Sequence, residues 1–159
     1  MRLHALLLAT VSCTACGDPP AAQATTETGA PAPAASAQAV DRLPLDLGYF
    51  VSADTPCAQA SNATVTLHHG KGINSARTAC EFTRIVKTGD DTYAVHDACT
   101  ELMSGSLEES DMRITVSGPT AYAVRYEGGD EDFPFRHCPQ PELPEPWRDN
   151  DLSDLLPPG

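Results

Sequence analysis

The stretch from residue 80 to residue 99 places the strongest constraint on this 159-residue chain, because it has the pattern of two strands joined by a tight turn. Both arms hold aromatic and β-branched residues, which favour a pleated, half-buried surface. Gly89 and Asp90 favour the turn between them. Cys80 and Cys99 lie symmetrically about that turn. The stretch therefore predicts a β-hairpin that anchors a small β domain.

Further strand-like segments lie on both sides of this hairpin, separated by turn residues. They span residues 45–51, 63–68, 112–116, 122–126 and 133–138. No long helical period lies between them, so we expect no parallel pairing through a crossover helix. We predict a mainly β fold, an antiparallel meander that closes into a small barrel or a strongly curved sheet, because closure removes exposed edges. The proline before Cys57 predicts one short helical turn there.

The amino-terminal segment has the pattern of an export signal. A weakly positive start precedes an apolar run at residues 5–11, far shorter than the ~20 residues that span a bilayer. Cys16 follows, between an alanine and a glycine, and this motif resembles the lipobox of bacterial lipoproteins. In that family the cysteine becomes the diacylated first residue of the mature chain. The resemblance implies a membrane anchor at Cys16, with Cys13 as the alternative acceptor.

Composition divides the chain into four parts. Residues 1–16 form the predicted signal peptide. Residues 17–42 are rich in Ala and Pro and cannot bury enough surface to offset their ordering entropy, so we predict a disordered linker. We expect residues 43–138 to form the β domain, and residues 139–159 to form a proline-rich, acidic tail that holds the only tryptophan, Trp147.

Four cysteines remain outside the export segment, and an even number in an exported chain predicts two disulfides. Counting outward from the turn places Cys80 opposite Cys99 at a hydrogen-bonded position, which we expect to be the harder position for a cross-strand bridge. We therefore favour Cys57–Cys80 with Cys99–Cys138. The pairing of Cys80 with Cys99 and of Cys57 with Cys138 remains open.

The sequence contains no set of residues with the spacing of a catalytic or metal site. His68 and His69 are adjacent, so on a strand they point to opposite faces. The serine-rich stretch at residues 104–108 lacks the closing glycine of a nucleophile elbow. We therefore expect no enzyme, no cofactor and no metal site. The formal net charge of −12 argues against nucleic-acid binding, which needs a basic face.

Beyond the lipobox, the domain resembles small proteobacterial envelope lipoproteins for which no activity is known. The residues that carry this resemblance are Gly48–Val51, Thr55–Cys57, Ser61–Thr64, Cys80, Cys99 and Cys138–Pro139. The resemblance implies a lipid-anchored position on the periplasmic side of the envelope, at either the inner or the outer membrane. It implies no activity.

We predict a non-enzymatic protein that presents its domain to an envelope protein with a basic surface, with inhibition as one form of this role. Asp130, Glu131, Asp132 and Trp147 are the candidate contact residues, because an acidic surface attracts a basic partner. The alternative is a small-molecule carrier with a barrel cavity. An apolar cavity of several hundred Å³ would favour the carrier, whereas a filled core with an exposed apolar patch would favour the protein-binding role.

Overall fold

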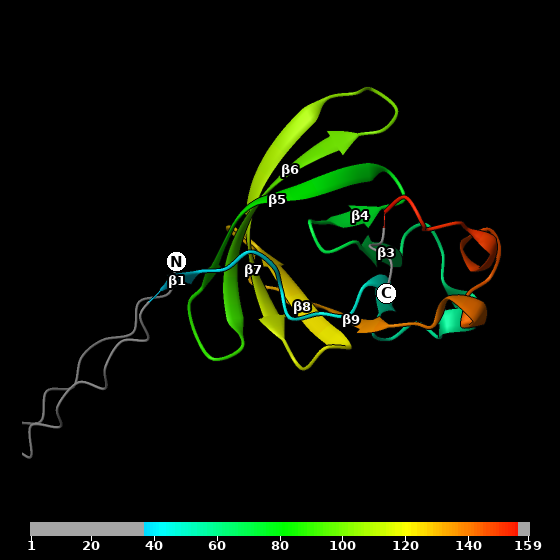
Figure 1. Ribbon diagram of the computed structural model, residues 1–159, viewed down its shortest axis with the longest axis horizontal. Helices are drawn as coiled ribbons and strands as arrows, with labels where there is room; N and C mark the ends of the chain where they lie inside the picture. Colours follow the sequence, from blue (N-terminus) through cyan, green and yellow to red (C-terminus); the bar gives the residue numbers. More distant parts are fainter. Residues whose placement is uncertain (1–36, 156–159) are drawn as a thin grey trace, which may run out of the picture. The chain divides into compact units, whose positions relative to one another are not determined.

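The computed structural model describes residues 37–155, and the predicted signal peptide lies outside them. Nine strands form one antiparallel sheet in the order β1-β5-β6-β7-β8-β9-β2-β3-β4 (Figure 1). The strands are β1 (Gln38–Ala39), β2 (Gly48–Ser52), β3 (Val65–His68), β4 (Ile73–Ser75), β5 (Thr78–Lys87), β6 (Thr92–Glu101), β7 (Leu107–Val116), β8 (Ala121–Tyr126) and β9 (Phe133–His137). The helical elements are the 3-10 turns η1 (Cys57–Gln59), η2 (Gln140–Glu142) and η3 (Trp147–Asp149). The predicted mainly β, antiparallel fold is confirmed.

The sheet curls into a half-barrel, so that its two ends meet along β5. β1 pairs with the far end of β5 at Lys87, whereas β4 and the loop before it lie beside the near end. There, the Phe82 N–H donates to the Lys71 carbonyl over 2.7 Å. The Cys80 N–H donates to Oδ1 of Asn74 over 2.9 Å. We call this junction of the β3–β4 loop and β4 with β5 the seam.

Gly72 lies at the closest approach across the seam. A Cβ at this position would lie only 1.9 Å from the carbonyl oxygen of Cys80. No side chain can occupy that space, and glycine is the residue that lets two backbones approach this closely. The seam therefore depends on Gly72.

The side chains on the inner face of the half-barrel are apolar core residues at one end and include a carboxylate and a disulfide at the other. At the end beside the β5–β6 turn, which we call the packed end, side chains of the main core fill the interior. These are Leu43, Leu45, Phe50, Ile85, Tyr93, Val95, Ile114, Val116, Tyr122 and Val124. Because successive side chains of a strand alternate between faces, β6 continues this inner row with Asp97 and Cys99 at the opposite end, which we call the open end.

A second buried cluster forms where the residues after β9 fold back on the domain. Leu143 and Tyr49 are buried members of this cluster, and Trp147 packs against it. Asn150 also donates a hydrogen bond to the hydroxyl of Tyr49 over 2.8 Å. At the other boundary, β1 joins the sheet ahead of residue 43. The β domain is therefore larger than residues 43–138, and it includes most of the described tail.

The disulfides join Cys80 to Cys99 and Cys57 to Cys138, so two bridges are confirmed but the favoured pairing is wrong. The cause is a β-bulge at Thr83, where the register of β5 against β6 shifts by one residue. Near the turn Lys87 faces Tyr93, so the turn is centred on Asp90. Counting from a turn centred between Gly89 and Asp90, and without the bulge, assigned the facing cysteines to the wrong kind of position.

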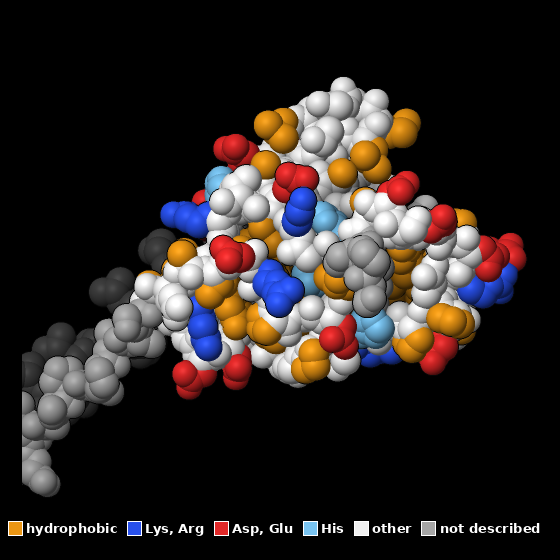
Figure 2. Space-filling model, viewed as in Figure 1, with side chains coloured by type: hydrophobic (Ala, Val, Ile, Leu, Met, Phe, Trp, Pro, Cys, Tyr) orange, Lys and Arg blue, Asp and Glu red, His pale blue; other side chains and the backbone are white. Residues whose placement is uncertain are grey.

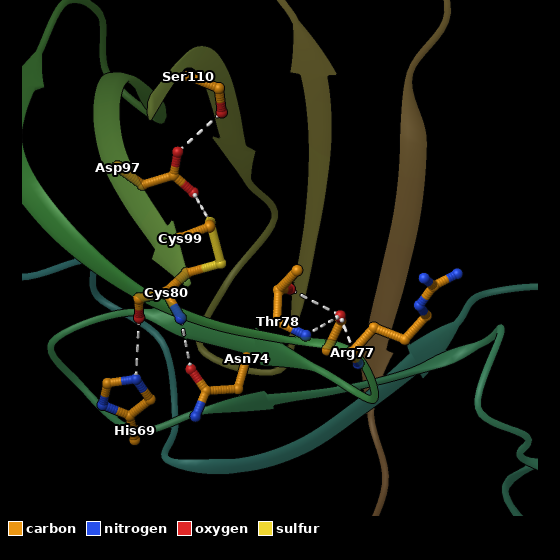
Figure 3. The surroundings of a disulfide bond; sticks show 9 residues. His69, Asn74, Arg77, Thr78, Cys80, Asp97, Cys99 and Ser110 are labelled. Carbon is orange, nitrogen blue, oxygen red and sulfur yellow. Dashed lines mark hydrogen bonds between the residues drawn. A yellow bond between two sulfur atoms is a disulfide. The ribbon is translucent and has the colours of Figure 1, made fainter. Parts of the chain in front are cut away.

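The backbone around Cys80 shows the effect of the bulge directly. Its N–H donates to Asn74 and its carbonyl accepts from Nε2 of His69, so both groups point away from Cys99 (Figure 3). The two Cα atoms lie 4.0 Å apart, closer to the ~4.5 Å of a non-hydrogen-bonded pair than to the ~5.5 Å of a hydrogen-bonded one. The pair therefore occupies the position that suits a cross-strand bridge.

Candidate functional site

The open end of the half-barrel contains a cavity of about 350 Å³, which we call the cup. Its wall combines inner-face residues of β3 to β9, so the curl of the sheet creates it. The apolar wall residues include Ile73, Phe82, Met112 and Phe135. The volume falls in the range of sites that bind small molecules, which are apolar with a few placed polar groups.

Aromatic rings form one wall of the cup and its mouth. Tyr122 and Phe135 stack with their ring centroids 5.1 Å apart, and Tyr126 lies tilted against Phe133 at 6.1 Å. Tyr122 is buried and its hydroxyl shares a hydrogen bond with Oγ1 of Thr66 over 3.1 Å. Burial raises the pKa of the Tyr122 phenol, so this group stays uncharged. Tyr126 is half exposed at the mouth.

One carboxylate, that of Asp97, is buried in the wall of the cup. Only 5% of the residue is exposed, although a carboxylate is rarely buried without a partner. Its Oδ1 accepts a hydrogen bond from Oγ of Ser110 over 2.7 Å, and its Oδ2 lies 3.2 Å from Sγ of Cys99 (Figure 3). Because Cys99 is bonded to Cys80, that sulfur carries no hydrogen to donate. Oδ2 therefore has no hydrogen-bond donor among the described residues.

The charge of Asp97 is not balanced by a cationic side chain of the described part of the chain. The ion pairs found there involve more exposed carboxylates, such as Asp111 with His96 at 3.0 Å and Asp132 with Arg125 at 2.6 Å. Burial, and secondly the negative charge of Asp97, raise the pKa of the Tyr126 phenol. The cup therefore contains a buried carboxylate whose negative charge contributes to the raised pKa of Tyr126.

Residues 37–155 contain one group of three potential metal ligands, formed by Cys80, Asp97 and Cys99. Their ligand atoms lie within 4.8 Å of one another. Metal ions bind the thiolate form of cysteine, and here both sulfurs are consumed by the disulfide. Asp97 is the single remaining ligand, and zinc needs three or four. The oxidised site is therefore unsuited to zinc.

A second, larger hollow of about 1120 Å³ lies between residues 40–47 and the β3–β4 loop. His68 is buried beside it and donates from Nδ1 to the Asp46 carbonyl over 2.9 Å, while Nε2 has no partner among the described residues. Burial lowers the pKa of His68, so the ring is neutral at pH 7. Residues 153–155 also border this groove, as do Leu43, Leu45 and Tyr93 of the main core, and it is more open than the cup.

Three exposed apolar side chains gather at the tip of the hairpin that joins β6 to β7. Figure 2 shows hydrophobic side chains on this projecting tip, at the top of the view. The exposed fractions are 60% for Leu102, 88% for Met103 and 64% for Leu107. Charged side chains of both signs are scattered over the rest of this face (Figure 2).

The predicted contact residues lie in two separate places. Asp130 and Glu131 are exposed in the turn before β9, whereas Asp132 is held by Arg125 through two hydrogen bonds of 2.8 and 2.6 Å. Trp147 lies in η3, beyond the opposite end of β9, and packs against the second buried cluster. The structure therefore does not combine the acidic turn and Trp147 into one surface.

The sequence analysis did not single out Asp97 or its partner Ser110. One signal was present, because Val95, Asp97 and Cys99 alternate along one strand and must share a face. A charged residue in a row that otherwise points to the core is unusual. The sequence does not show, however, where along β6 the packed core ends and the cavity begins, because that point depends on side chains from strands that are distant in the sequence.

No family model matches this chain, and no curated protein or solved structure matches it. Within residues 37–155, no helix has the length and apolar character needed to cross a membrane. The function proposed below rests on the geometry of the cup.

Proposed function

We propose that this protein is a small-molecule carrier that holds its ligand in the cup. The supporting observation is the cavity of about 350 Å³, which is lined by apolar, aromatic and polar side chains and has one buried carboxylate in its wall. Ligand sites of this size, with few polar groups, form preferentially in the mouths of β-barrels.

Different wall residues would make the apolar and the polar contacts with the ligand. Phe135, which stacks on the buried Tyr122, would provide apolar contact, and burial of apolar area contributes about 25 cal/mol per Å². Asp97 and Ser110 provide the polar contact that orients the ligand. The Cys80–Cys99 bridge holds β5 and β6 together at the cup.

The proposal includes the lipid anchor at Cys16, supported by the lipobox-like segment. The anchor would hold the domain at the periplasmic surface of a membrane, where a carrier meets ligands with apolar bodies. Replacement Cys16→Ser should release the protein from membranes, and a variant that still sediments with them at an unchanged mature mass would contradict the anchor.

Binding in the cup can be tested with N-phenyl-1-naphthylamine, a neutral dye that fluoresces in apolar surroundings. The full chain should bind it saturably at one site. Ile73→Trp places an indole in the cup and should weaken binding by about tenfold or more, whereas Ile73→Val should change it by less than about twofold. Absence of saturable binding, or equal binding by Ile73→Trp, would contradict the carrier.

A second candidate function is the presentation of the domain to a basic envelope protein. The exposed acidic turn at Asp130 and Glu131 favours it, as do the exposed apolar side chains at the β6–β7 tip. Such binding should weaken with salt, because the Debye length falls from ~10 Å at 0.1 M to ~3 Å at 1 M. A complex that is insensitive to salt and to Asp130→Asn with Glu131→Gln would exclude the acidic turn.

A further inference from the structure

We infer that the cup selects an organic cation, a ligand with an ammonium group on an apolar body, and that Asp97 recognises its charge. This inference rests on the proposed function and deepens it by naming the chemical class of the ligand.

The first argument is the unfinished coordination of Asp97. A buried carboxylate is costly unless it is both paired and hydrogen-bonded. Ser110 supplies one hydrogen bond to Oδ1, whereas Oδ2 faces a disulfide sulfur that cannot donate. Any ammonium group beside Oδ2 would supply the missing opposite charge, and a protonated amine would supply the missing donor as well. A neutral ligand supplies at most the donor.

The second argument is the sign of the groups around the cup. Its described lining contains no Lys, Arg or His. The other ionisable residues that line it are Glu108 and Glu109, both exposed, and Tyr122 and Tyr126; the carboxylate of Glu109 lies 3.9 Å from His96. An anionic ligand would therefore meet like charges from β6 and β7, while a cation meets only opposite or neutral groups.

The third argument is the aromatic mouth. The faces of tyrosine and phenylalanine rings attract cations, most strongly where water is excluded. Tyr126, whose ring lies tilted against Phe133, is a half-exposed residue of the lining, and Tyr122 and Phe135 stack in the wall. A cation that enters passes ring faces before it reaches Asp97. The same rings accommodate the apolar body of the ligand.

The test compares two probes of the same shape, phenyltrimethylammonium and tert-butylbenzene, which differ by one positive charge. Each is titrated against the dye-loaded full chain, and displacement of the dye gives its affinity. The cation should bind about tenfold more tightly, or better, than its neutral counterpart. Asp97→Asn should remove most of this preference, leaving only the part that the ring faces supply, and should keep the affinity for tert-butylbenzene within about twofold.

Asp111→Asn is the matched control, because it removes the same charge from the outer face of β7, where Asp111 contacts His96. It should keep the full preference. If Asp97→Asn fails to fold, the comparison of the two probes on the unmodified chain still tests whether the cup prefers the cation. Tyr126→Leu, at the exposed mouth, should then weaken the cation more than the neutral probe.

The outcomes separate this inference from the proposed function. Equal affinity for the two probes, or an Asp97→Asn variant that keeps the preference, would overturn the cation site while the carrier survives. Failure of the dye and of both probes to bind would overturn the carrier itself.

Discussion

The two ends of the half-barrel are built from the same strands, but one end is filled with core side chains and the other contains a cavity. At the packed end, β6 directs Tyr93 and Val95 into a filled core. At the open end, the same strand directs Asp97 and Cys99 into a cavity. The difference shows that the role of a strand changes along its length, because the side chains it meets from distant strands change with height in the barrel.

The comparison also explains where the cross-strand disulfide lies. The packed end is stabilised by apolar burial, whereas the open end has an unfilled interior and an unpaired carboxylate. The Cys80–Cys99 bridge closes a loop of about twenty residues at that end and contributes ~3 kcal/mol in the chain-entropy account. Apolar burial at the packed end therefore allows the open end to remain unfilled.

The largest expected difference between the ends concerns core truncation. Phe50→Ala removes a fully buried ring from the packed end and should lower the free energy of unfolding by ~3–5 kcal/mol. Met112→Ala, in the wall of the cup, should cost only about 1–2 kcal/mol, because the cavity there is already present. Urea unfolding measures both. Equal losses would contradict the division into a packed and an open end.

The seam beside the cup should be the next most sensitive place. Gly72→Ala forces a methyl group against the Cys80 carbonyl and should cost ~1–3 kcal/mol. Gly89→Ala is the control, because its Cβ would meet Thr92 at an ordinary 3.5 Å. A loss for Gly72→Ala no larger than that for Gly89→Ala would show that the half-barrel does not depend on this contact.

Asp97 should behave as a binding residue and not as a stabilising one. Asp97→Asn removes an unpaired buried charge, so in the absence of ligand the free energy of unfolding should stay within ~1 kcal/mol or rise. Thermal unfolding of the ligand-free chain measures this. A large loss, compared with the Asp111→Asn control, would mean that the folded chain already balances the Asp97 charge.

The smallest expected effect is a pH dependence at the boundary of the main core. Burial lowers the pKa of His68 in the folded chain. The unfolded chain therefore binds more protons there, and the free energy of unfolding should fall as the pH drops below the ordinary value of 6.5. In His68→Gln this part of the slope should vanish. An unchanged slope in the variant would assign the pH dependence to other groups.

The sequence predicts the strands well and the cysteine geometry poorly, for a physical reason. Alternation and turn residues are local signals, and they place the β5–β6 hairpin correctly. The bulge at Thr83 has no such signal, because threonine is an ordinary strand residue, yet it changes which cysteines can pair. The packing of Leu143 and Trp147 depends on contacts with β2, far away in the sequence.

The candidate site was predictable only in part. A cavity inside a closed β-sheet was expected only as the alternative to a filled core. The position of Asp97 on the inner face follows from alternation, but its lack of a cationic partner does not. That property depends on the full set of residues that seven strands bring to the cup.

The most direct test of the account is a titration of the isotope-labelled full chain with phenyltrimethylammonium, followed through backbone amide NMR shifts. We predict saturable shifts at Asp97, Ser110 and Tyr126 at the open end, with little change at Ile114 in the packed end or at His68 beside the groove. Shifts that centre on the groove or on the β6–β7 tip, or no saturable shift at all, would contradict the claim that the open end of the half-barrel is a binding site for organic cations.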